Sequence, residues 1–450
     1  MLYWIIKPFV AIFFRVFYKI GYKGRENIPL NTPVVLAPNH VNAFIDPVAL
    51  GLLTRRKVRF FARGDVFKGW LAKTVLGSMG ISPMYRIQEG YAEIKKNDKT
   101  FEECRRRLTA NQVILLFPEG ICVQERRLRP LKKGLARIIF QTEETLDFKK
   151  DVLVIPVGLN YTAAYKFRSK LFIDIGKPIS IKEYEASFKQ DKVRTINDFT
   201  KMFEQKMAEH LVIIKNKDND KLIEDIEEIY FHQWIKDRND THKSLERQYQ
   251  ATREIASMIN VLDTEYPQII ESLKETTSTY IKELNKFNLR DHLLRPENIS
   301  KMNFLSFIFE SQLILWGSII YFFGLIMNYP PYYFAKLFST KKIKNIEFFA
   351  SVYANVAMVF WGIYYAIQIL TFALVFRNWM SLGIYALTIP VLGFYCLWFY
   401  PIRQKIFGRW RLLRMVRKDK TSVENLVKVR AEIILELENA KRTYIEFLKS

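Results

Sequence analysis

Short apolar runs alternate with longer polar stretches between residues 25 and 180. The runs are rich in β-branched and aromatic residues, and the stretches between them are rich in helix-forming residues. The runs are "PVVLAP" (33–38), "VRFFA" (58–62), "VILLFP" (113–118), "VLVIPVG" (152–158) and "LFIDIG" (171–176). Strands that alternate with helices predict an α/β domain over residues 25–215, with a mixed sheet covered by helices on both faces.

A charged helical pattern without strand-like runs occupies residues 216–300 and predicts a helical arm. Residues 403–450 begin with a basic stretch and continue with apolar residues at near-helical spacing. A capping-box pattern, Thr421 to Glu424, precedes that spacing. We expect an amphipathic C-terminal helix that packs on the arm.

Residues 303–402 are predominantly apolar and predict a membrane region. Within it, residues 348–376 and 378–402 carry no charged side chain. Each is long enough to cross a hydrocarbon core of about 30 Å at about 1.5 Å per residue. The link between them is short, so residues 348–402 predict a transmembrane hairpin.

Lysine and arginine flank this hairpin on both sides, which by the positive-inside tendency places both of its ends in the cytoplasm. The cations are Lys336, Lys341, Lys342 and Lys344 before it and Arg403, Lys405, Arg409, Arg411, Arg414, Arg417 and Lys418 after it. An apolar segment at 304–338 that crossed the membrane would put the α/β domain outside. We favour a re-entrant segment, broken at Pro330 and Pro331, which leaves the α/β domain on the cytoplasmic face; a spanning segment is the alternative.

The N-terminal residues 1–24 are apolar but interrupted by cations. On a helix with about 100° per residue, Lys7, Arg15 and Lys19 fall within roughly one third of the circumference. The opposite side is apolar and contains Trp4, Ile5, Phe9, Ile12, Phe13 and Val16. This pattern favours an amphipathic helix that lies in the membrane interface, and an uncleaved spanning anchor is the alternative.

The formal net charge of +23 indicates a polyanionic partner, either nucleic acid or an anionic membrane surface. Aromatic residues make up 15% of the chain and concentrate in the long apolar segments, which favours the lipid bilayer. The three cysteines, Cys104, Cys122 and Cys396, have no CxxC spacing, so the sequence suggests neither a zinc site nor a disulfide framework. A reducing cytoplasmic setting follows.

The stretch "PVVLAPNHVNAFIDP" carries His40 and Asp46. A His in a loop after a strand lies where α/β sheets place their sites. Asp46-Pro47 is a good helix start, with Asp46 as N-cap, so a loop joins His40 to Asp46. An Asp that bonds one imidazole nitrogen leaves the other free to accept a proton. A structural His beside a capping Asp explains this stretch equally well.

Further polar or turn residues stand at the ends of apolar runs. Arg86 ends "GISPMYR", and its planar guanidinium suits phosphate. Glu119 and Gly120 follow a strand in "FPEG", ahead of a basic stretch, and Pro156 lies within "VIPVG". Four such runs that each deliver a polar or turn residue indicate a functional site.

These blocks resemble the glycerophospholipid acyltransferase family in kind and order. They are "NHVNAFID", "GISPMYR", "FPEG" and "VIPVG", with "YKGRENIP" (22–29) similar to the family's lead-in. The His-Asp block has five intervening residues where most of the family has four, which resembles the branch of glycerol-3-phosphate and dihydroxyacetone-phosphate acyltransferases. In "FPEGICVQE", Ile121 stands where the family usually has Thr or Ser.

The resemblance implies a membrane-bound enzyme of phospholipid biosynthesis that transfers a fatty acyl group to glycerol-3-phosphate. The donor would be acyl-CoA or acyl-carrier protein, with no cofactor or metal. His40, oriented by Asp46, would be the general base. The acceptor-binding residues that the resemblance implies are Arg86, Glu119, Gly120 and Pro156. Arg63, Lys68 and Lys132 are candidate phosphate contacts, although solvated surface cations explain them equally well.

Lysophosphatidate and dihydroxyacetone phosphate are the alternative acceptors within the family. A transporter is disfavoured because the uncharged spans offer no polar path. A nucleic-acid-binding protein would explain the charge but not the hairpin. A non-catalytic membrane scaffold has no need of a His-Asp block together with "FPEG".

Overall fold

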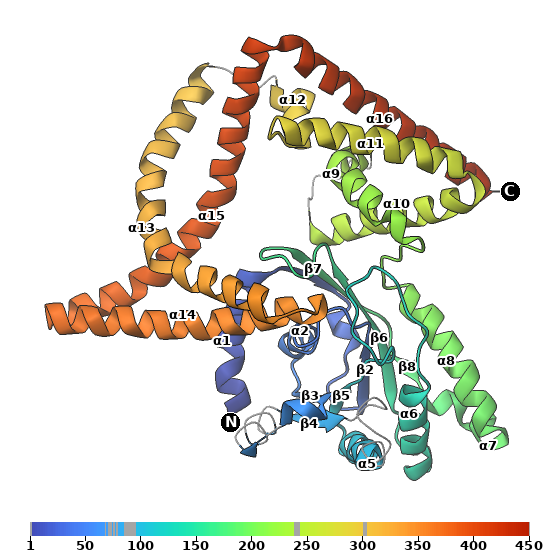
Figure 1. The fold of residues 1–450 in the computed structure, drawn as a ribbon. Helices are drawn as coiled ribbons and strands as arrows, with labels where there is room; N and C mark the ends of the chain where they lie inside the picture. Colours follow the sequence, from blue (N-terminus) through green and yellow to red (C-terminus); the bar gives the residue numbers. More distant parts are fainter. Residues whose placement is uncertain are drawn as a thin grey trace. The chain divides into compact units, whose positions relative to one another are not determined.

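The structure is a computed structural model that describes residues 2–67, 69–70, 74, 77, 80–84, 96–237, 244–299 and 304–449 (Figure 1). The chain divides into two compact units. Unit 1 comprises Met1–Ile213, Ser244–Tyr249 and Asn345–Ser351, and unit 2 comprises Ile214–Lys243, Gln250–Lys344 and Val352–Ser450.

Unit 1 is built on an eight-stranded sheet with strand order β1-β7-β6-β2-β5-β3-β4, and β8 also pairs with β6. The strands are β1 (Lys19–Lys23), β2 (Val34–Pro38), β3 (Val58–Arg63), β4 (Ile81–Met84), β5 (Val113–Leu115), β6 (Leu153–Tyr161), β7 (Lys170–Ile175) and β8 (Ile179–Ser180). The pairs from β6 through β2, β5 and β3 to β4 are parallel, as is β1 with β7, whereas β6 pairs antiparallel with β7 and β8. The predicted mixed α/β sheet is confirmed.

Helices cover both faces of this sheet (Figure 1). On one face, α5 (Lys96–Thr109), α6 (Gly134–Thr145) and α8 (Lys192–Ala208) enclose an apolar core that includes Val35 and Val154. On the other face lie α1 (Leu2–Phe17) and α2 (Ile45–Leu53). Every residue of β2 is buried, because this central strand is covered on both sides.

Unit 2 contains the predicted arm helices and the C-terminal helix. The helices are α9 (Asp220–Asp237), α10 (Leu245–Glu265, whose first turn belongs to unit 1), α11 (Pro267–Lys286), α12 (Pro296–Ile299) and α16 (Lys420–Phe447). The α16 helix packs on α11 and α9, which confirms that the tail binds the arm. The predicted capping box is wrong, because Asp419 is the N-cap, two residues before Thr421, and its side chain accepts the Ser422 N–H at 3.0 Å.

Three helices of the described chain are long and apolar enough to cross a membrane: α13 (Phe304–Lys342), α14 (Ile346–Phe376) and α15 (Trp379–Lys418). The sequence predicted a break at Pro330 and Pro331, but α13 continues as one helix through both prolines with a change of direction (Figure 1). Two prolines remove the N–H groups that would bond the carbonyls of Ile326 and Met327.

Side chains of α14 replace those missing donors. The Tyr364 hydroxyl donates to the Ile326 carbonyl at 3.0 Å, and the Gln368 amide donates to the Met327 carbonyl at 3.2 Å. The indole N–H of Trp361 donates to the neighbouring carbonyl of Asn328 at 3.1 Å. Neighbouring donors of this kind allow a helix to pass through proline in an apolar setting.

Candidate active site

The loop between β2 and α2 carries the predicted His40, and the first turn of α2 carries Asp46, both at the carboxyl end of the parallel strands. Asp46 is not the N-cap of α2, because the helix begins at Ile45 and Phe44 occupies the cap position. The Asp46 side chain instead turns back over the loop that precedes it. The additional residue between His40 and Asp46 is therefore absorbed in the loop.

Four hydrogen bonds hold the Asp46 carboxylate, which is fully buried. Its Oδ2 atom accepts from His40 Nδ1 at 3.0 Å and from the backbone N–H groups of Val41 at 2.8 Å and Asn42 at 2.7 Å. Its Oδ1 atom accepts from the Tyr161 hydroxyl at 2.7 Å. Because an ionised carboxylate only accepts, this pairing assigns the proton of a neutral His40 ring to Nδ1.

The imidazole of His40 is also fixed by stacking. Its ring lies 3.7 Å from the ring of Phe117 at an interplanar angle of 17°. The side chain retains 11% of its exposure, and within the described part of the chain Nε2 has no hydrogen-bond partner. An oriented imidazole with one free nitrogen can accept a proton from a hydroxyl group that approaches it.

The FPEG segment holds the backbone of His40. The Glu119 carboxylate is buried and accepts the His40 N–H at 3.1 Å, while the His40 carbonyl accepts the Val123 N–H at 3.0 Å. Burial raises the pKa of Glu119 to about 7, against the opposing effect of the backbone N–H bonds from His40 and Arg129. Glu119 is thus positioned to support the His40 loop.

Gly120 adopts a left-handed conformation with φ of 72°. A Cβ atom at this position would lie 3.4 Å from Cγ of Lys132, and the Lys132 N–H donates to the Pro118 carbonyl at 2.8 Å. The exposed Lys132 ammonium has no hydrogen-bond or ion-pair partner among the described residues. The structure therefore places Lys132 beside the FPEG turn.

The structure describes the side chains of only some of the other candidate residues. Lys68 and Arg86 lie outside the described residues, and for Arg63, the last residue of β3, only the backbone is described. Pro156 is buried in β6 opposite Ala37. Its carbonyl accepts the Gly176 N–H at 2.9 Å, just beyond the end of β7, and proline supplies no N–H for the reciprocal bond.

Sequence reasoning missed two residues that complete the site. The Asn39 amide joins the loop to β6, because its Oδ1 accepts the Leu159 N–H at 2.7 Å and its Nδ2 donates to the Leu159 carbonyl at 3.2 Å. Tyr161 ends β6 and donates to Asp46; burial, and then the charge of Asp46, raise its pKa far above the ordinary value. Because β2 and β6 are parallel neighbours, their carboxyl ends lie side by side, and polar residues at both ends could have been predicted to meet.

A distant segment of unit 1, Asn345–Ser351, also contacts the loop. The Ser351 hydroxyl accepts the Phe44 N–H at 3.0 Å, and the Ile346 carbonyl accepts from the Gln124 amide at 3.0 Å. Gln124 also donates to the Asn42 side chain at 3.0 Å. This segment includes the first turns of α14, so the loop that carries His40 lies beside the start of a membrane-length helix.

A mixed α/β sheet with a His-Asp pair and an FPEG turn at its carboxyl edge defines an acyltransferase type of domain. Residues 19–160 match the family described as Acyltransferase. These residues form an acyltransferase domain, and the curated relatives are consistent with the glycerophospholipid acyltransferase family that the sequence blocks resemble.

Similar proteins include Glycerol-3-phosphate O-acyltransferase 1 of Saccharomyces cerevisiae, which is 25% identical over 53% of this chain and 31% of the relative. The chloroplastic 1-acyl-sn-glycerol-3-phosphate acyltransferase LPAT1 of Arabidopsis thaliana is 27% identical over 35% of this chain and 40% of the relative. The chain thus spans less than half the length of either. The crystal structure of the 1-acyl-sn-glycerophosphate acyltransferase PlsC from Thermotoga maritima matches 46% of this chain and 79% of its own, with 18% identity and a TM-score of 0.33.

Proposed function

We propose that the protein transfers a fatty acyl group from a thioester donor, acyl-CoA or acyl-carrier protein, to a hydroxyl group of glycerol-3-phosphate. The observation that carries this proposal is the His40–Asp46 pair, with Nδ1 bound at 3.0 Å and Nε2 free within the described residues. The product is a lipid of phospholipid biosynthesis.

In this mechanism, Nε2 of His40 takes the proton of the acceptor hydroxyl as its oxygen attacks the thioester carbonyl. The carbon–oxygen bond forms, the carbon–sulfur bond breaks, and the imidazolium returns the proton to the departing thiolate. Asp46 stabilises the transient positive charge on the ring. Buried and bonded at both oxygens, its carboxylate keeps one geometry throughout the step.

Glycerol-3-phosphate is the proposed acceptor because of the five-residue spacing and the likeness to the yeast glycerol-3-phosphate acyltransferase. Lysophosphatidate is the second candidate, supported by the likeness to the Arabidopsis enzyme. Dihydroxyacetone phosphate is a third acceptor for the same assay. We propose that Lys132, beside the FPEG turn, binds the phosphate of the acceptor. Arg86, from the block "GISPMYR", is the second proposed phosphate-binding cation.

An acylation assay with the three acceptors tests this function. The His40→Ala variant should lose about 10²- to 10⁴-fold in kcat, the usual contribution of a positioned base. The matched control is His232→Ala, which lies in unit 2 and pairs with Glu297 at 2.5 Å. A kcat of His40→Ala that stays within about tenfold of the wild type refutes His40 as the general base. A higher kcat/KM for lysophosphatidate than for glycerol-3-phosphate refutes glycerol-3-phosphate as the acceptor.

The phosphate contact has its own test. Lys132→Ala should raise KM for glycerol-3-phosphate by about tenfold, because a charge-assisted hydrogen bond contributes about 1.5–3 kcal/mol. The neighbouring exposed Lys133 provides the control, Lys133→Ala, which removes the same charge one residue away. Equal KM values for the two variants would show that Lys132 is a solvated surface cation that does not bind the acceptor phosphate.

We further propose that the acyltransferase domain lies on the cytoplasmic face. Cys122 is partly exposed, whereas Cys104 is buried. In sealed right-side-out vesicles, a membrane-impermeant maleimide should therefore label Cys122 only after permeabilisation. The Cys122→Ser variant measures any labelling that comes from Cys396 instead. Labelling of Cys122 in intact vesicles would place the domain outside.

A further inference from the structure

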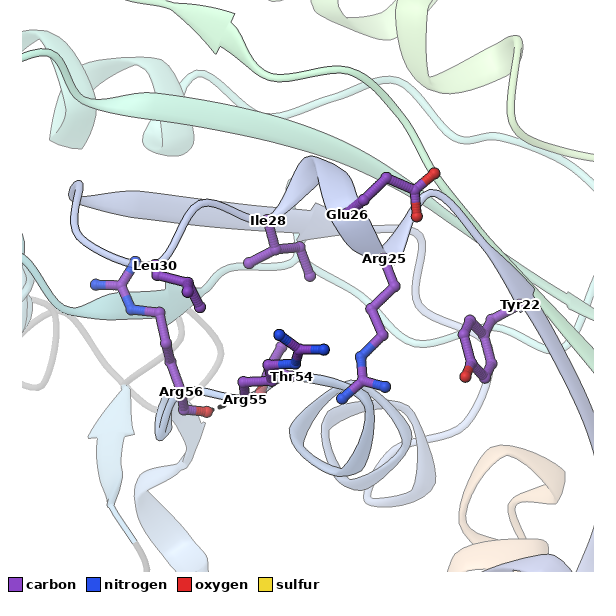
Figure 2. Close-up of a pocket in the computed structure, with 8 residues that line it drawn as sticks. All are labelled: Tyr22, Arg25, Glu26, Ile28, Leu30, Thr54, Arg55 and Arg56. Carbon is purple, nitrogen blue, oxygen red and sulfur yellow. Dashed lines mark hydrogen bonds between the residues drawn. The ribbon is translucent and has the colours of Figure 1, made fainter.

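A cavity of about 460 Å³ opens in unit 1 beside residues that precede β2 and β3 (Figure 2). Its walls come from the turn between β1 and β2 and from the turn between α2 and β3. The lining residues are Tyr22, Arg25, Glu26, Ile28, Leu30, Thr54, Arg55 and Arg56. Three arginines and one carboxylate give this cavity a positive charge.

The three guanidinium groups differ in whether they have hydrogen-bond partners. Arg56 is engaged by the backbone, since it donates to the carbonyls of Pro29 at 2.9 Å and Thr32 at 2.7 Å. The guanidinium groups of Arg25 and Arg55 have no hydrogen bond or ion pair within the described part of the chain, and the Nε atom of Arg25 is buried without an acceptor. A buried donor without a partner indicates a missing acceptor.

The charge of the cavity is not neutralised from within. Figure 2 shows the carboxylate of Glu26 pointing away from the guanidinium groups of Arg25 and Arg55. A further cation stands next to the cavity, because the Lys7 ammonium donates to the Thr54 carbonyl at 2.8 Å. Burial, and then the charge of Arg25, lower the pKa of Lys7. The field in the cavity therefore favours an anion.

This cavity is separate from the proposed acceptor site. It lies at the amino ends of β2 and β3, whereas His40 and Glu119 follow the carboxyl ends of β2 and β5. The five residues of β2 extend roughly 17 Å at about 3.3 Å per residue, so a molecule as small as glycerol-3-phosphate cannot reach both.

The α1 helix connects the cavity to a lipid surface. It packs on α2 and bears Lys7, and its outer side exposes Trp4 (52%), Phe9 (69%) and Ile12 (54%). An exposed apolar side on an amphipathic helix with an interfacial tryptophan is typical of helices that lie in the headgroup region. The cavity next to such a helix is within reach of lipid headgroups.

We infer that this cavity binds the phosphate of an anionic membrane phospholipid. The planar forks of Arg25 and Arg55 match phosphate oxygens, and Ile28 and Leu30 offer apolar surface beside them. A phosphomonoester headgroup fits best, because its charge of about −1.5 to −2 at neutral pH balances two guanidinium groups. The site goes beyond the proposed acyl transfer and does not depend on it.

The test uses the full chain in detergent and a short-chain phosphatidic acid as the probe, with binding measured by titration calorimetry. Arg25→Gln/Arg55→Gln should weaken binding by about tenfold for each guanidinium removed. The control Arg194→Gln/Lys201→Gln removes the same charge from exposed positions of α8 and should leave binding unchanged. His40→Ala should also bind normally, which separates this site from the acyl-transfer proposal.

A second variant guards against misfolding: Arg55→Gln alone changes one exposed side chain and should weaken binding about tenfold at an unchanged melting temperature. Inorganic phosphate and CoA, at the same concentration as the probe, should not displace it. Unchanged binding by Arg55→Gln overturns the site. Displacement by inorganic phosphate or CoA overturns the lipid as its occupant.

Discussion

The hydroxyl of Tyr161 donates a 2.7 Å hydrogen bond to Oδ1 of Asp46, the carboxylate oxygen that His40 does not use. Tyr161 ends β6, and Asp46 lies in the first turn of α2. Because burial and the nearby carboxylate raise the pKa of Tyr161, its hydroxyl keeps its proton at every physiological pH. The orientation of the candidate base thus depends on a tyrosine that lies 115 residues after Asp46 in the sequence.

Tyr161→Phe should therefore lower kcat by about tenfold and leave KM for the acceptor nearly unchanged. The substitution removes a hydrogen bond to a charged group, which contributes about 1.5–3 kcal/mol, and leaves Oδ1 of Asp46 buried without a donor. Steady-state kinetics measures the effect, with the exposed Tyr165→Phe as control. An unaltered kcat would show that His40 keeps its orientation without this bond.

Glu119 should make stability depend on pH. Burial raises the pKa of Glu119 from 4.5 to about 7, so the folded state holds the proton more tightly than the unfolded state. The resulting stabilisation is fully present below about pH 4.5, is lost as the pH rises to about 7, and amounts to at most about 3 kcal/mol.

Thermal unfolding in detergent across this pH range checks the effect. Glu119→Gln can still accept the His40 N–H but cannot ionise, so its melting temperature should fall less with pH than that of the wild type. Glu143, whose pKa is raised to about 7 by burial, acts in the same direction, and Glu143→Gln provides the matched comparison. A wild-type slope retained in Glu119→Gln would contradict the role of this carboxyl.

Gly120→Ala should destabilise the protein by about 1–2 kcal/mol, because Gly120 has a φ of 72° that L-residues disfavour. The added Cβ would meet only Cγ of Lys132 at 3.4 Å, so the backbone conformation dominates the effect. The control is Gly134→Ala at the start of α6, where a Cβ meets nothing within 4 Å. Melting temperatures that fall equally in both variants would exclude the turn as the cause.

Arg430 anchors the C-terminal helix within unit 2. Its Nε donates to Oδ1 of Asp291 at 2.7 Å, and the two side chains are 10% and 0% exposed. Arg430→Met leaves the buried Asp291 without its closest cation and should cost about 3–5 kcal/mol in the free energy of unfolding.

Denaturant unfolding of the full chain in detergent measures this loss. Lys428→Met on the same helix breaks an exposed pair, Lys428–Glu432 at 3.8 Å, and should cost less than about 1 kcal/mol. A similar cost for both substitutions would mean that the Arg430 pair is no stronger than a surface pair.

Much of unit 1 could be predicted from the sequence because its strands are apolar and bounded by turn residues. The buried run of β2 leads directly to His40, and the carboxyl ends of parallel strands meet at one edge, so the approach of FPEG to His40 was also predictable. The contact of Asp46 with His40 was predicted as well, but its expected role as N-cap was wrong, because its side chain accepts the N–H groups of the preceding loop.

The remaining misses depend on contacts between residues distant in sequence. No local pattern shows that Ser351 accepts the backbone N–H of Phe44 in the His40 loop, 307 residues earlier. The expected break at Pro330 followed the general rule for proline, which fails here because the side chains that bond the freed carbonyls belong to another helix.

Those bonds tie the order of membrane insertion to the order of the chain. As α13 emerges during synthesis, the carbonyls of Ile326 and Met327 have no helical donor, and in hydrocarbon each unsatisfied carbonyl costs several kcal/mol. Their partners, Tyr364 and Gln368, are translated about 40 residues later. The hydrogen bonds of α13 at its two prolines are thus complete only once α14 has been synthesised and packs against it.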